Sequence, residues 1–245
     1  MNRRVLTAAL AAMLIFPAAA AAQLSLQDDT GWMSNLRVTP FIGYLTSFER
    51  TEEWFHTGGT EADRVRVQTD IAGGTTFGLE GEYPLRGRFG AAAAAAFASR
   101  DRSFVVLHTG EMAELDGNNV FLLRAGGVMH LREDDTELVK RRLGASVFAG
   151  GVVMHERPHD ELGTADLLDS ATHFGVNFGV AGELPFGNDR FAVNAAIEDN
   201  IMWWSDGPST NLAASYFDDE PATATIESDL THAWLVRAGV SIRIR

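Results

Sequence analysis

The densest group of residues that could bind a metal or move a proton runs from His155 to Asp160. It places two imidazoles and two carboxylates in the order His-Glu-Arg-Pro-His-Asp. Zinc is often held by histidines one helical turn apart, but Pro158 argues against a helix at this point. The sequence therefore predicts no metal site and no cofactor.

Two histidines stand close enough to serines along the chain to suggest a nucleophilic dyad. Ser103 precedes His108 in one polar segment, and His155 precedes Ser170 in another. Serine becomes a nucleophile only where a base is positioned beside it, and neither pair belongs to a recognisable motif. We therefore expect no catalytic residue in this protein.

The composition excludes several classes of function. The chain has 245 residues, with 20 Lys and Arg against 33 Asp and Glu, a net charge of −13, and no cysteine. A chain this acidic repels phosphate backbones and anionic membrane surfaces, so nucleic-acid binding is not expected. The absence of cysteine excludes disulfides and thiolate metal sites.

The first 22 residues have the organisation of a secretory signal peptide. Two arginines, Arg3 and Arg4, precede an apolar stretch that is too short to span a bilayer, and small residues follow up to Ala22. We expect a signal peptide over 1–22 and one domain over 23–245. The mature domain then has a net charge of about 18 − 33 = −15, because the leader removes two arginines.

The mature sequence alternates between two kinds of residue with the period of a β-strand. From His173 to Leu184, bulky apolar residues occupy every second position and small or polar residues the others. Alternation of this kind predicts eight strands, over 36–48, 75–83, 88–98, 120–131, 143–154, 173–184, 190–203 and 232–244. One strand contains the run Ala91 to Ala96, whose helix propensity we expect its neighbours to override.

The connections between these segments alternate in length. Residues 49–74, 99–119, 155–172 and 204–231 form long connections, 84–87 and 185–189 form short ones, and 132–142 is intermediate. Outer-membrane barrels have short periplasmic turns and long external loops around an even number of antiparallel strands. The sequence therefore predicts an all-β fold: an eight-stranded antiparallel transmembrane β-barrel of the outer membrane, an up-and-down meander with both termini in the periplasm.

Aromatic residues stand near the ends of the predicted strands, as expected for girdles at the two membrane interfaces. The predicted girdle residues are Phe48, Phe77, Tyr83, Phe89, Phe97, Phe121, Phe174, Phe191, Trp203 and Trp234. The bulky face belongs in lipid because eight strands enclose little interior volume, which small residues fill. A soluble, lipocalin-like carrier is the alternative, and it would bury the bulky face instead.

These features together resemble the small eight-stranded outer-membrane barrels of the OmpA and OmpX type. The resemblance covers the mature length and rests on the leader, the strand count, the loop alternation and strands such as 174–180 and 238–242. It implies a monomer with a structural or surface-interaction role, surrounded by outer-membrane lipids and lipopolysaccharide and inserted by the barrel assembly machinery. The chain departs from such barrels at its end, Ile242-Arg-Ile-Arg245, which lacks the usual terminal aromatic residue. A lipid A or phospholipid modifying enzyme acting at the rim is the alternative.

Charged residues on the predicted inner face are balanced in number. The predicted lumen network consists of Arg37, Glu80, Glu82, Arg124, Glu183, Glu198, Arg237 and Arg243. An unpaired charge in a narrow lumen costs several kcal/mol, so we expect a hydrogen-bonded plug in two layers. Arg124, Glu198 and Arg237 are expected near mid-height, and Arg37, Glu82, Glu183 and Arg243 nearer the periplasm. A narrow, charge-lined ion channel is the alternative.

Acidic residues also occupy positions that the barrel does not explain. Asp199 is in the outward register of its strand, which a β-bulge or a position above the bilayer would accommodate. Two of the long connections are rich in carboxylates, at Glu49, Glu52, Glu53, Glu61 and Asp63 in the first and at Asp218, Asp219, Glu220, Glu227 and Asp229 in the last. We expect solvated loops there; bridging of lipopolysaccharide through divalent cations is the sharper alternative.

Overall fold

A computed structural model describes ten stretches of the chain, over residues 36–56, 64–85, 88–107, 109–131, 144–158, 170–186, 190–204, 209–217, 221–226 and 230–244. The predicted signal peptide lies outside the described residues.

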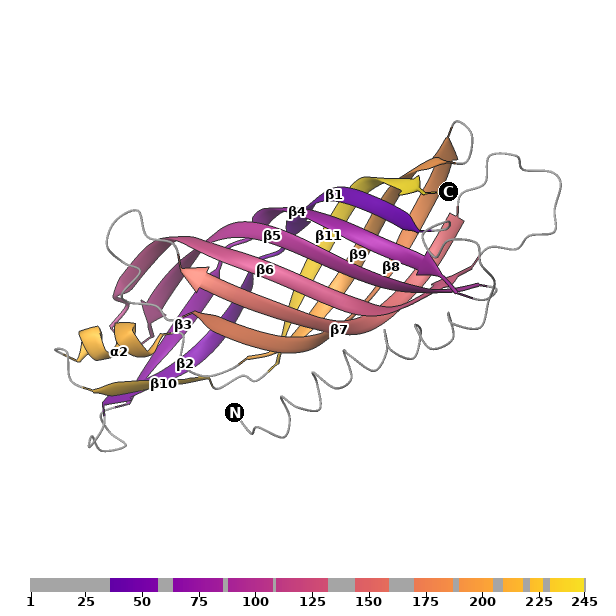
Figure 1. Cartoon of the computed structure of the whole chain (residues 1–245). Coiled ribbons are helices and arrows are strands. Elements are labelled where there is room, and N and C mark those ends of the chain that lie inside the picture. Colours follow the sequence, from indigo (N-terminus) through magenta and orange to yellow (C-terminus); the bar gives the residue numbers. More distant parts are fainter. Residues whose placement is uncertain are drawn as a thin grey trace.

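Eight long strands form a closed antiparallel barrel (Figure 1). They follow one another around the barrel in chain order, and β11 closes it by pairing with β1. The predicted fold is thus confirmed, including the meander order. The strands are β1 (Arg37–Leu45), β4 (Gly74–Pro84), β5 (Phe89–Val106), β6 (Met112–His130), β7 (Gly144–Pro158), β8 (Ala171–Phe186), β9 (Phe191–Trp203) and β11 (Leu230–Arg243).

The alanine run of β5 is a strand, as expected. Ala91 to Ala96 pair with β4 on one side and with β6 on the other. Two complete ladders of backbone hydrogen bonds outweigh the intrinsic preference of alanine for a helix.

The long connections contain regular structure, which corrects the expectation of solvated loops. The first holds β2 (Phe48–His56) and β3 (Val65–Ile71), and the last holds α2 (Thr210–Tyr216) and β10 (Ala222–Ile226). The strands β5 and β6 continue past the barrel and pair with each other, and β3 pairs with the extension of β5. We call the unit formed by β2, β3, β10, α2 and these two extensions the cap. It lies at the lower left in Figure 1.

The cap has its own apolar core. Side chains from β2, β3, the β5 extension, β10 and α2 are buried together, namely Trp54, Val65, Val67, Phe104, Val106, Ala213 and Ala224. The carboxylate of Glu52, expected in a solvated loop, is fully buried beside this core. The acidic residues named for the last connection, and Glu61 and Asp63 of the first connection, lie outside the described residues.

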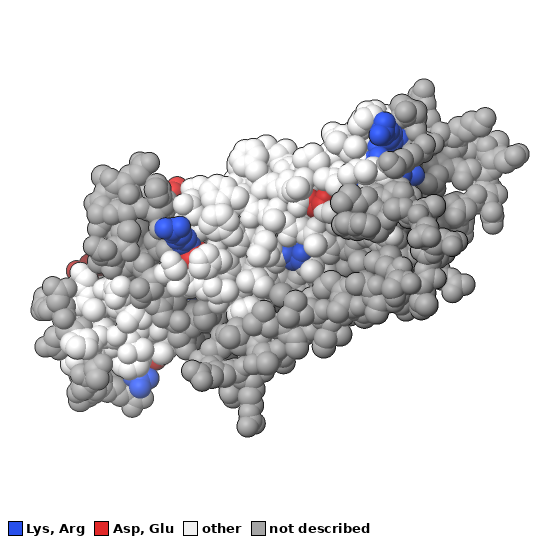
Figure 2. All heavy atoms as spheres, viewed as in Figure 1, with Lys and Arg blue, Asp and Glu red and all other residues white. Residues whose placement is uncertain are grey.

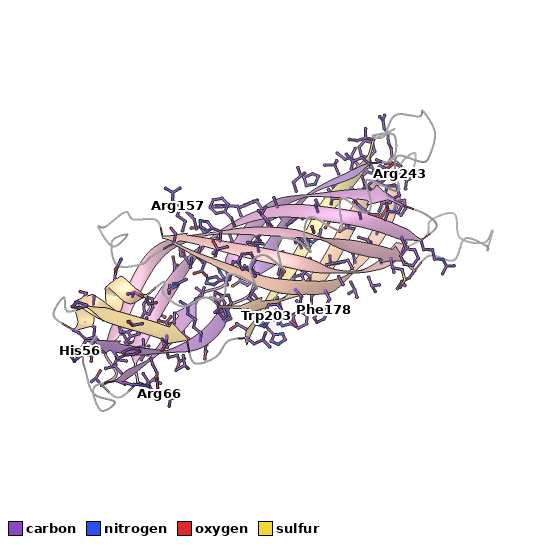
Figure 3. The ribbon with its side chains drawn as sticks, turned by 60° about the horizontal axis from the view of Figure 1, so that its bottom comes forward. His56, Arg66, Arg157, Phe178, Trp203 and Arg243 are labelled. Atoms are coloured by element: carbon purple, nitrogen blue, oxygen red, sulfur yellow. The ribbon has the colours of Figure 1, made fainter. Side chains whose placement is uncertain are left out.

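The outer wall of the barrel is apolar. Outward side chains such as Ile42, Leu79, Leu123, Phe178 and Val236 are largely exposed. On the face drawn in Figure 2, uncharged side chains cover most of the described surface, and Figure 3 shows Phe178 and Trp203 on the outside of the barrel. Among the described residues, none of the helical structure is long and apolar enough to cross a membrane.

The interior of the barrel also contains an apolar layer, on the side of the cap. Its buried residues include Leu45, Leu122, Val152, Met202 and Leu235. They come from strands on all sides of the barrel, so their side chains meet in the lumen. This layer lies between the charged side chains of the lumen and the cap.

Candidate functional site

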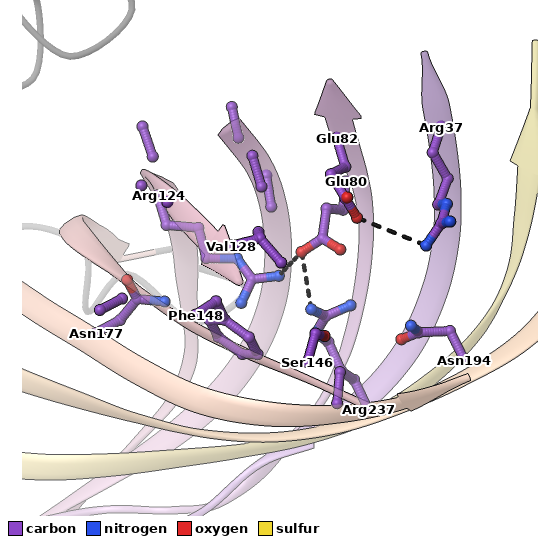
Figure 4. A pocket seen from close by; sticks show the side chains of 18 of the residues that line it. Arg37, Glu80, Glu82, Arg124, Val128, Ser146, Phe148, Asn177, Asn194 and Arg237 are labelled. Atoms are coloured by element: carbon purple, nitrogen blue, oxygen red, sulfur yellow. Dashed lines mark hydrogen bonds and ion pairs between the residues drawn. The ribbon is translucent and has the colours of Figure 1, made fainter. Parts of the chain in front are cut away.

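The centre of the lumen holds a network of four charged side chains from four different strands, of which Glu80, Arg124 and Arg237 are labelled in Figure 4. Glu80 of β4 accepts hydrogen bonds from Arg124 Nη2 at 2.6 Å and from Arg237 Nη2 at 2.8 Å. Glu198 of β9 forms an ion pair with Arg124, while Arg237 Nε lies 3.8 Å from its carboxylate. Because β6 and β9 are separated by two strands, the Arg124–Glu198 pair spans the barrel.

A second charged group lies nearer the end with short turns. Arg37 of β1 pairs with Glu183 of β8 and lies 3.7 Å from Glu82 of β4. His130 Nε2 lies 2.6 Å from the same Glu82 carboxylate, a partner that the sequence analysis did not assign. Arg243 stands opposite Arg37 in the register, close enough to Glu82 for its charge to act on that carboxylate. The structure therefore places the predicted residues in two layers, with Glu80 in the central one.

Two aromatic rings line the central network from inside the barrel. The Cζ atom of Arg237 lies 4.9 Å from the centre of the Phe41 ring, and that of Arg124 lies 5.5 Å from the centre of the Phe148 ring. The sequence leaves the inward face of this strand ambiguous, because the bulky, apolar Phe148 shares a face with the small residues Ser146 and Gly150. Its inward position is explained by the cation–π contacts it makes with both guanidinium groups.

Little space remains between these side chains. The cavity bounded by the two layers, Asn177 and Asn194 has room for water-sized molecules over about 30 Å³. Each water needs about 10–15 Å³ by this measure, so the cavity holds two or three. Buried polar atoms such as Asn194 Oδ1 and Arg237 Nη1 lack a protein partner, and such waters would satisfy them.

A third charged group lies on the cap side of the apolar layer, and the sequence analysis missed it. Arg102 of β5 pairs with Glu156 of β7, and His173 Nε2 of β8 lies 3.8 Å from the same carboxylate. Arg100 donates from Nε to the carbonyl oxygen of Ala72 at 2.7 Å. The sequence contained a signal for this group, because the inward-facing positions of β5 continue past Phe97 to residues 100 and 102. Both residues lie in a segment that we had assigned to a loop.

Inside the cap, Glu52 is the most completely hydrogen-bonded carboxylate. Its Oε1 accepts from Arg50 Nε at 2.8 Å, and from Thr69 and Ser209 at 3.2 Å each. Its Oε2 accepts from Trp54 Nε1 at 2.9 Å. Burial by itself raises the pKa of Glu52, but the Arg50 charge and the Trp54 and Ser209 donors outweigh it and hold the pKa below its ordinary value. Burial lowers the pKa of Arg50, because it disfavours the charged form of the guanidinium.

The structure places nine of the ten predicted girdle residues on the outer wall and corrects the tenth. Phe48 is 6% exposed and packs against Trp204, with ring centres 5.0 Å apart, inside the molecule. The cause is a break between β1 and β2 at Thr46 and Ser47, after which even-numbered rather than odd-numbered residues face inward. The alternation was read without this break, so Phe48 was assigned to the wrong face.

Of the two candidate catalytic pairs, His155 with Ser170 is the one whose members both lie among the described residues. His155 Nδ1 hydrogen-bonds Thr172 Oγ1 at 2.9 Å rather than Ser170. His108 and His159 lie outside the described residues, so the Ser103 pair and the second imidazole of the 155–160 run cannot be placed. No group of His, Asp and Glu among the described residues is arranged to hold a metal ion.

The structure excludes one of the two accommodations expected for Asp199, the β-bulge. Its strand shows no register shift against either neighbour, so no bulge turns it inward. Instead, its Oδ2 lies 2.6 Å from Nδ1 of His232 on the outer wall.

Comparison with known proteins supports the fold. No protein-family model and no curated protein matches the sequence. Among solved structures, the chain is similar to the outer membrane protein OprG from Pseudomonas aeruginosa, with 12% identity, a TM-score of 0.62, and coverage of 89% of this chain and 100% of that one. It is also similar to Neisserial surface protein A, with 9% identity, a TM-score of 0.46, and coverage of 85% and 97%. At these identities the likeness to OprG shows a shared fold alone: the chain has the fold of a small outer-membrane β-barrel.

Proposed function

We propose that this protein is a monomeric outer-membrane barrel of the OmpA and OmpX type with a structural or surface-interaction role and a closed lumen. The observation that carries the proposal is the interior. The Glu80–Arg124–Glu198–Arg237 network is followed by the apolar layer around Leu122 and Met202, so an ion would have to break buried pairs and then cross a dry segment. This arrangement favours a plugged barrel over a narrow ion channel.

The location follows from the outer wall. A continuous band of exposed Phe, Leu, Val, Ile and Trp side chains around a closed barrel suits lipid contact and would be costly in water. A soluble, lipocalin-like carrier would show the opposite distribution. Membrane fractionation tests the location, and a shift in gel migration on boiling the detergent-extracted protein tests the folded barrel. A protein that washes off membranes would contradict the proposal.

The cap is proposed to lie outside the cell, with the short turns in the periplasm. Because the chain has no cysteine, single substitutions can report on each end. Thr109→Cys, in the turn between β5 and β6, should react with a membrane-impermeant maleimide on intact cells. Arg88→Cys, beside the turn between β4 and β5, should react only after the cells are opened. The reverse pattern would invert the orientation.

The proposed role includes no catalysis, and lipids and lipopolysaccharide are proposed as the surroundings of the barrel rather than its substrates. Support comes from His130, His155 and His232, which hydrogen-bond carboxylates or threonine. Mass spectrometry of lipid A and phospholipids from cells with and without the protein tests this. Loss or gain of an acyl chain would replace the proposal with a lipid-modifying enzyme.

The permeability test uses the purified protein in planar bilayers. The wild-type barrel should give no stable openings of porin size, since eight strands enclose a lumen that side chains fill. Passage of small sugars would contradict a closed lumen.

A further inference from the structure

The most unusual feature of the outer wall is a carboxylate. Asp199 stands in the outward register of β9, between Phe178 on β8 and Trp234 on β11. Its neighbours along the strand, Ile197 and Ile201, belong to the apolar band. Asp199 takes no part in the charged networks of the lumen, because those networks lie on the opposite face of the sheet.

His232 covers this carboxylate and offers a second polar atom to the surroundings. Asp199 is only 2% exposed, whereas the side chain of His232 is 53% exposed. The Nδ1 atom of the imidazole is used by Asp199 Oδ2 at 2.6 Å, which fixes the orientation of the ring. Its Nε2 atom makes no hydrogen bond with a described residue.

The pair lies close to the interface level of the wall. Leu230, at the start of β11, stands opposite Trp203, and His232 is two residues further along. With a rise of about 3.3 Å per residue and a strand tilt of about 40°, His232 lies roughly 5 Å below Leu230 along the barrel axis. Because Trp side chains sit at the headgroup level, this is the depth of the acyl ester groups.

The chemistry at this depth selects the kind of partner. Paired with the Asp199 carboxylate, an imidazole of His232 that carries a proton on both ring nitrogens gives a neutral unit, which a low-dielectric environment favours over a lone carboxylate. Nε2–H is then a hydrogen-bond donor that faces the lipid. Ile201, Val176 and Phe178 continue the wall beside it as an apolar surface. A neutral hydrogen-bond acceptor attached to hydrocarbon chains fits both the Nε2–H donor and the apolar surface beside it.

We propose that Asp199 and His232 form a binding site for an outer-leaflet lipid, in which His232 Nε2–H donates to an acyl-ester carbonyl and the chain lies along Val176, Ile201 and Phe178. Asp199 positions and neutralises the imidazole. The site rests on the proposed membrane location and orientation, but it goes beyond them, since a barrel in the same position without this pair would meet lipids with no preference for the ester.

The test compares two probe lipids that differ only in the proposed acceptor. The full-length protein is placed in nanodiscs of diacyl phosphatidylglycerol mixed with its dialkyl-ether analogue of equal chain length. Native mass spectrometry then counts the lipids that stay bound when the protein is released from the nanodisc. The wild type should retain the diester about fivefold over the diether, the ratio that a hydrogen bond of about 1 kcal/mol produces. His232→Phe should show no preference, and Val193→Phe, an outward substitution elsewhere on β9, should keep it.

Equal retention of the two lipids by the wild type would overturn the proposal, as would an ester preference that survives in His232→Phe. The heat-dependent gel shift separates these outcomes from failure of the proposed function, because a protein that never forms the barrel shows no shift. The ¹⁵N resonance of His232 Nε2 in wild-type protein gives a second measurement that needs no variant. It should differ between pure diester and pure diether nanodiscs, and an unchanged resonance would also overturn the site.

Discussion

At the scale of single residues, the lumen shows how charges are kept inside a narrow barrel. Each carboxylate of the central network contacts at least one guanidinium, and each guanidinium lies over an aromatic ring. A buried ion pair of this kind adds little net stability, but removing one partner leaves an uncompensated charge. We therefore expect a substitution of one member of the network to destabilise the barrel more than the paired substitution of a carboxylate and its guanidinium.

Replacing Glu198 with alanine should destabilise the barrel by about 3–5 kcal/mol, because the two guanidinium groups of Arg124 and Arg237 then share the single carboxylate of Glu80 and one buried charge is left uncompensated. The midpoint of unfolding in urea, followed by tryptophan fluorescence, measures the loss. Glu183→Ala is the matched control with a smaller expected loss, since Arg37 keeps Glu82 at 3.7 Å. The double variant Glu198→Leu with Arg124→Met should recover much of the stability, and Glu80 would still hold Arg237. Additive losses would show that the two residues do not interact.

Acid should loosen the cap through Glu52. A carboxyl group whose pKa is lower in the folded protein stabilises the fold above its ordinary value near 4.3, and this stabilisation is lost as the pH falls through the folded pKa. We expect an unchanged cap at neutral pH and a transition below about pH 4. The ¹⁹F resonance of 5-fluorotryptophan at Trp54, assigned with Trp54→Phe, reports it. Glu52→Gln should remove the acid dependence, and a transition that persists in that variant would assign it to another group.

At the scale of elements, the cap and the barrel have separate cores joined by continuous strands. The cap core around Trp54 and Phe104 and the barrel layer around Leu122 are distinct clusters. Strands β5 and β6 run through both. Ser209, at the start of α2, donates to Glu52 of β2 and so ties the last connection to the first. The cap is thus a folded platform on the barrel rather than a set of independent loops.

Trp54→Ala should unfold the cap locally without melting the barrel. Removing a buried indole costs about 3–5 kcal/mol, and the cap core has few other large side chains to compensate. Hydrogen exchange should accelerate in β2, β3 and β10, while β4, β7, β8 and β9 stay protected. The outward Trp234→Ala serves as the control that leaves the cap protected. Faster exchange throughout the barrel in Trp54→Ala would mean that the two cores unfold as one unit.

At the scale of the whole molecule, the interior is closed at more than one level. The central network and the apolar layer both lie within the barrel, below the cap. We therefore expect the lumen to stay closed without the cap.

Replacing residues 49–70 with a short Gly-Ser turn should remove the β2–β3 hairpin and still leave a non-conducting barrel. Single-channel recording in planar bilayers measures this, with the wild type recorded alongside and the gel shift confirming that the shortened protein folds. Openings of porin size that appear only on removal of the hairpin would assign the seal to the cap instead of to the layer around Leu122.

Much of the barrel was predictable from sequence because its two faces meet different surroundings. Residues of β8 and β11 alternate strictly, and a slip of one position would exchange the faces, so the register could be read. The same argument assigned Glu80, Arg124, Glu198 and Arg237 to the interior. Their mutual pairing followed only in outline, since the sequence grouped Arg124, Glu198 and Arg237 at mid-height, and the structure adds Glu80 as the carboxylate that binds both arginines.

The sequence by itself determined the class of fold, the number of barrel strands and the inward charges, because period-two alternation records which face each residue occupies. Only the tertiary structure decided what lies above the barrel. There Phe48, Glu52 and Arg102 are buried by strands distant in sequence, and a break at Thr46 and Ser47 reverses the alternation. A carboxylate such as Glu52 looks solvated in a sequence because its burial depends on partners that distant segments supply, and here Thr69 and Ser209 supply them, as His232 does for Asp199.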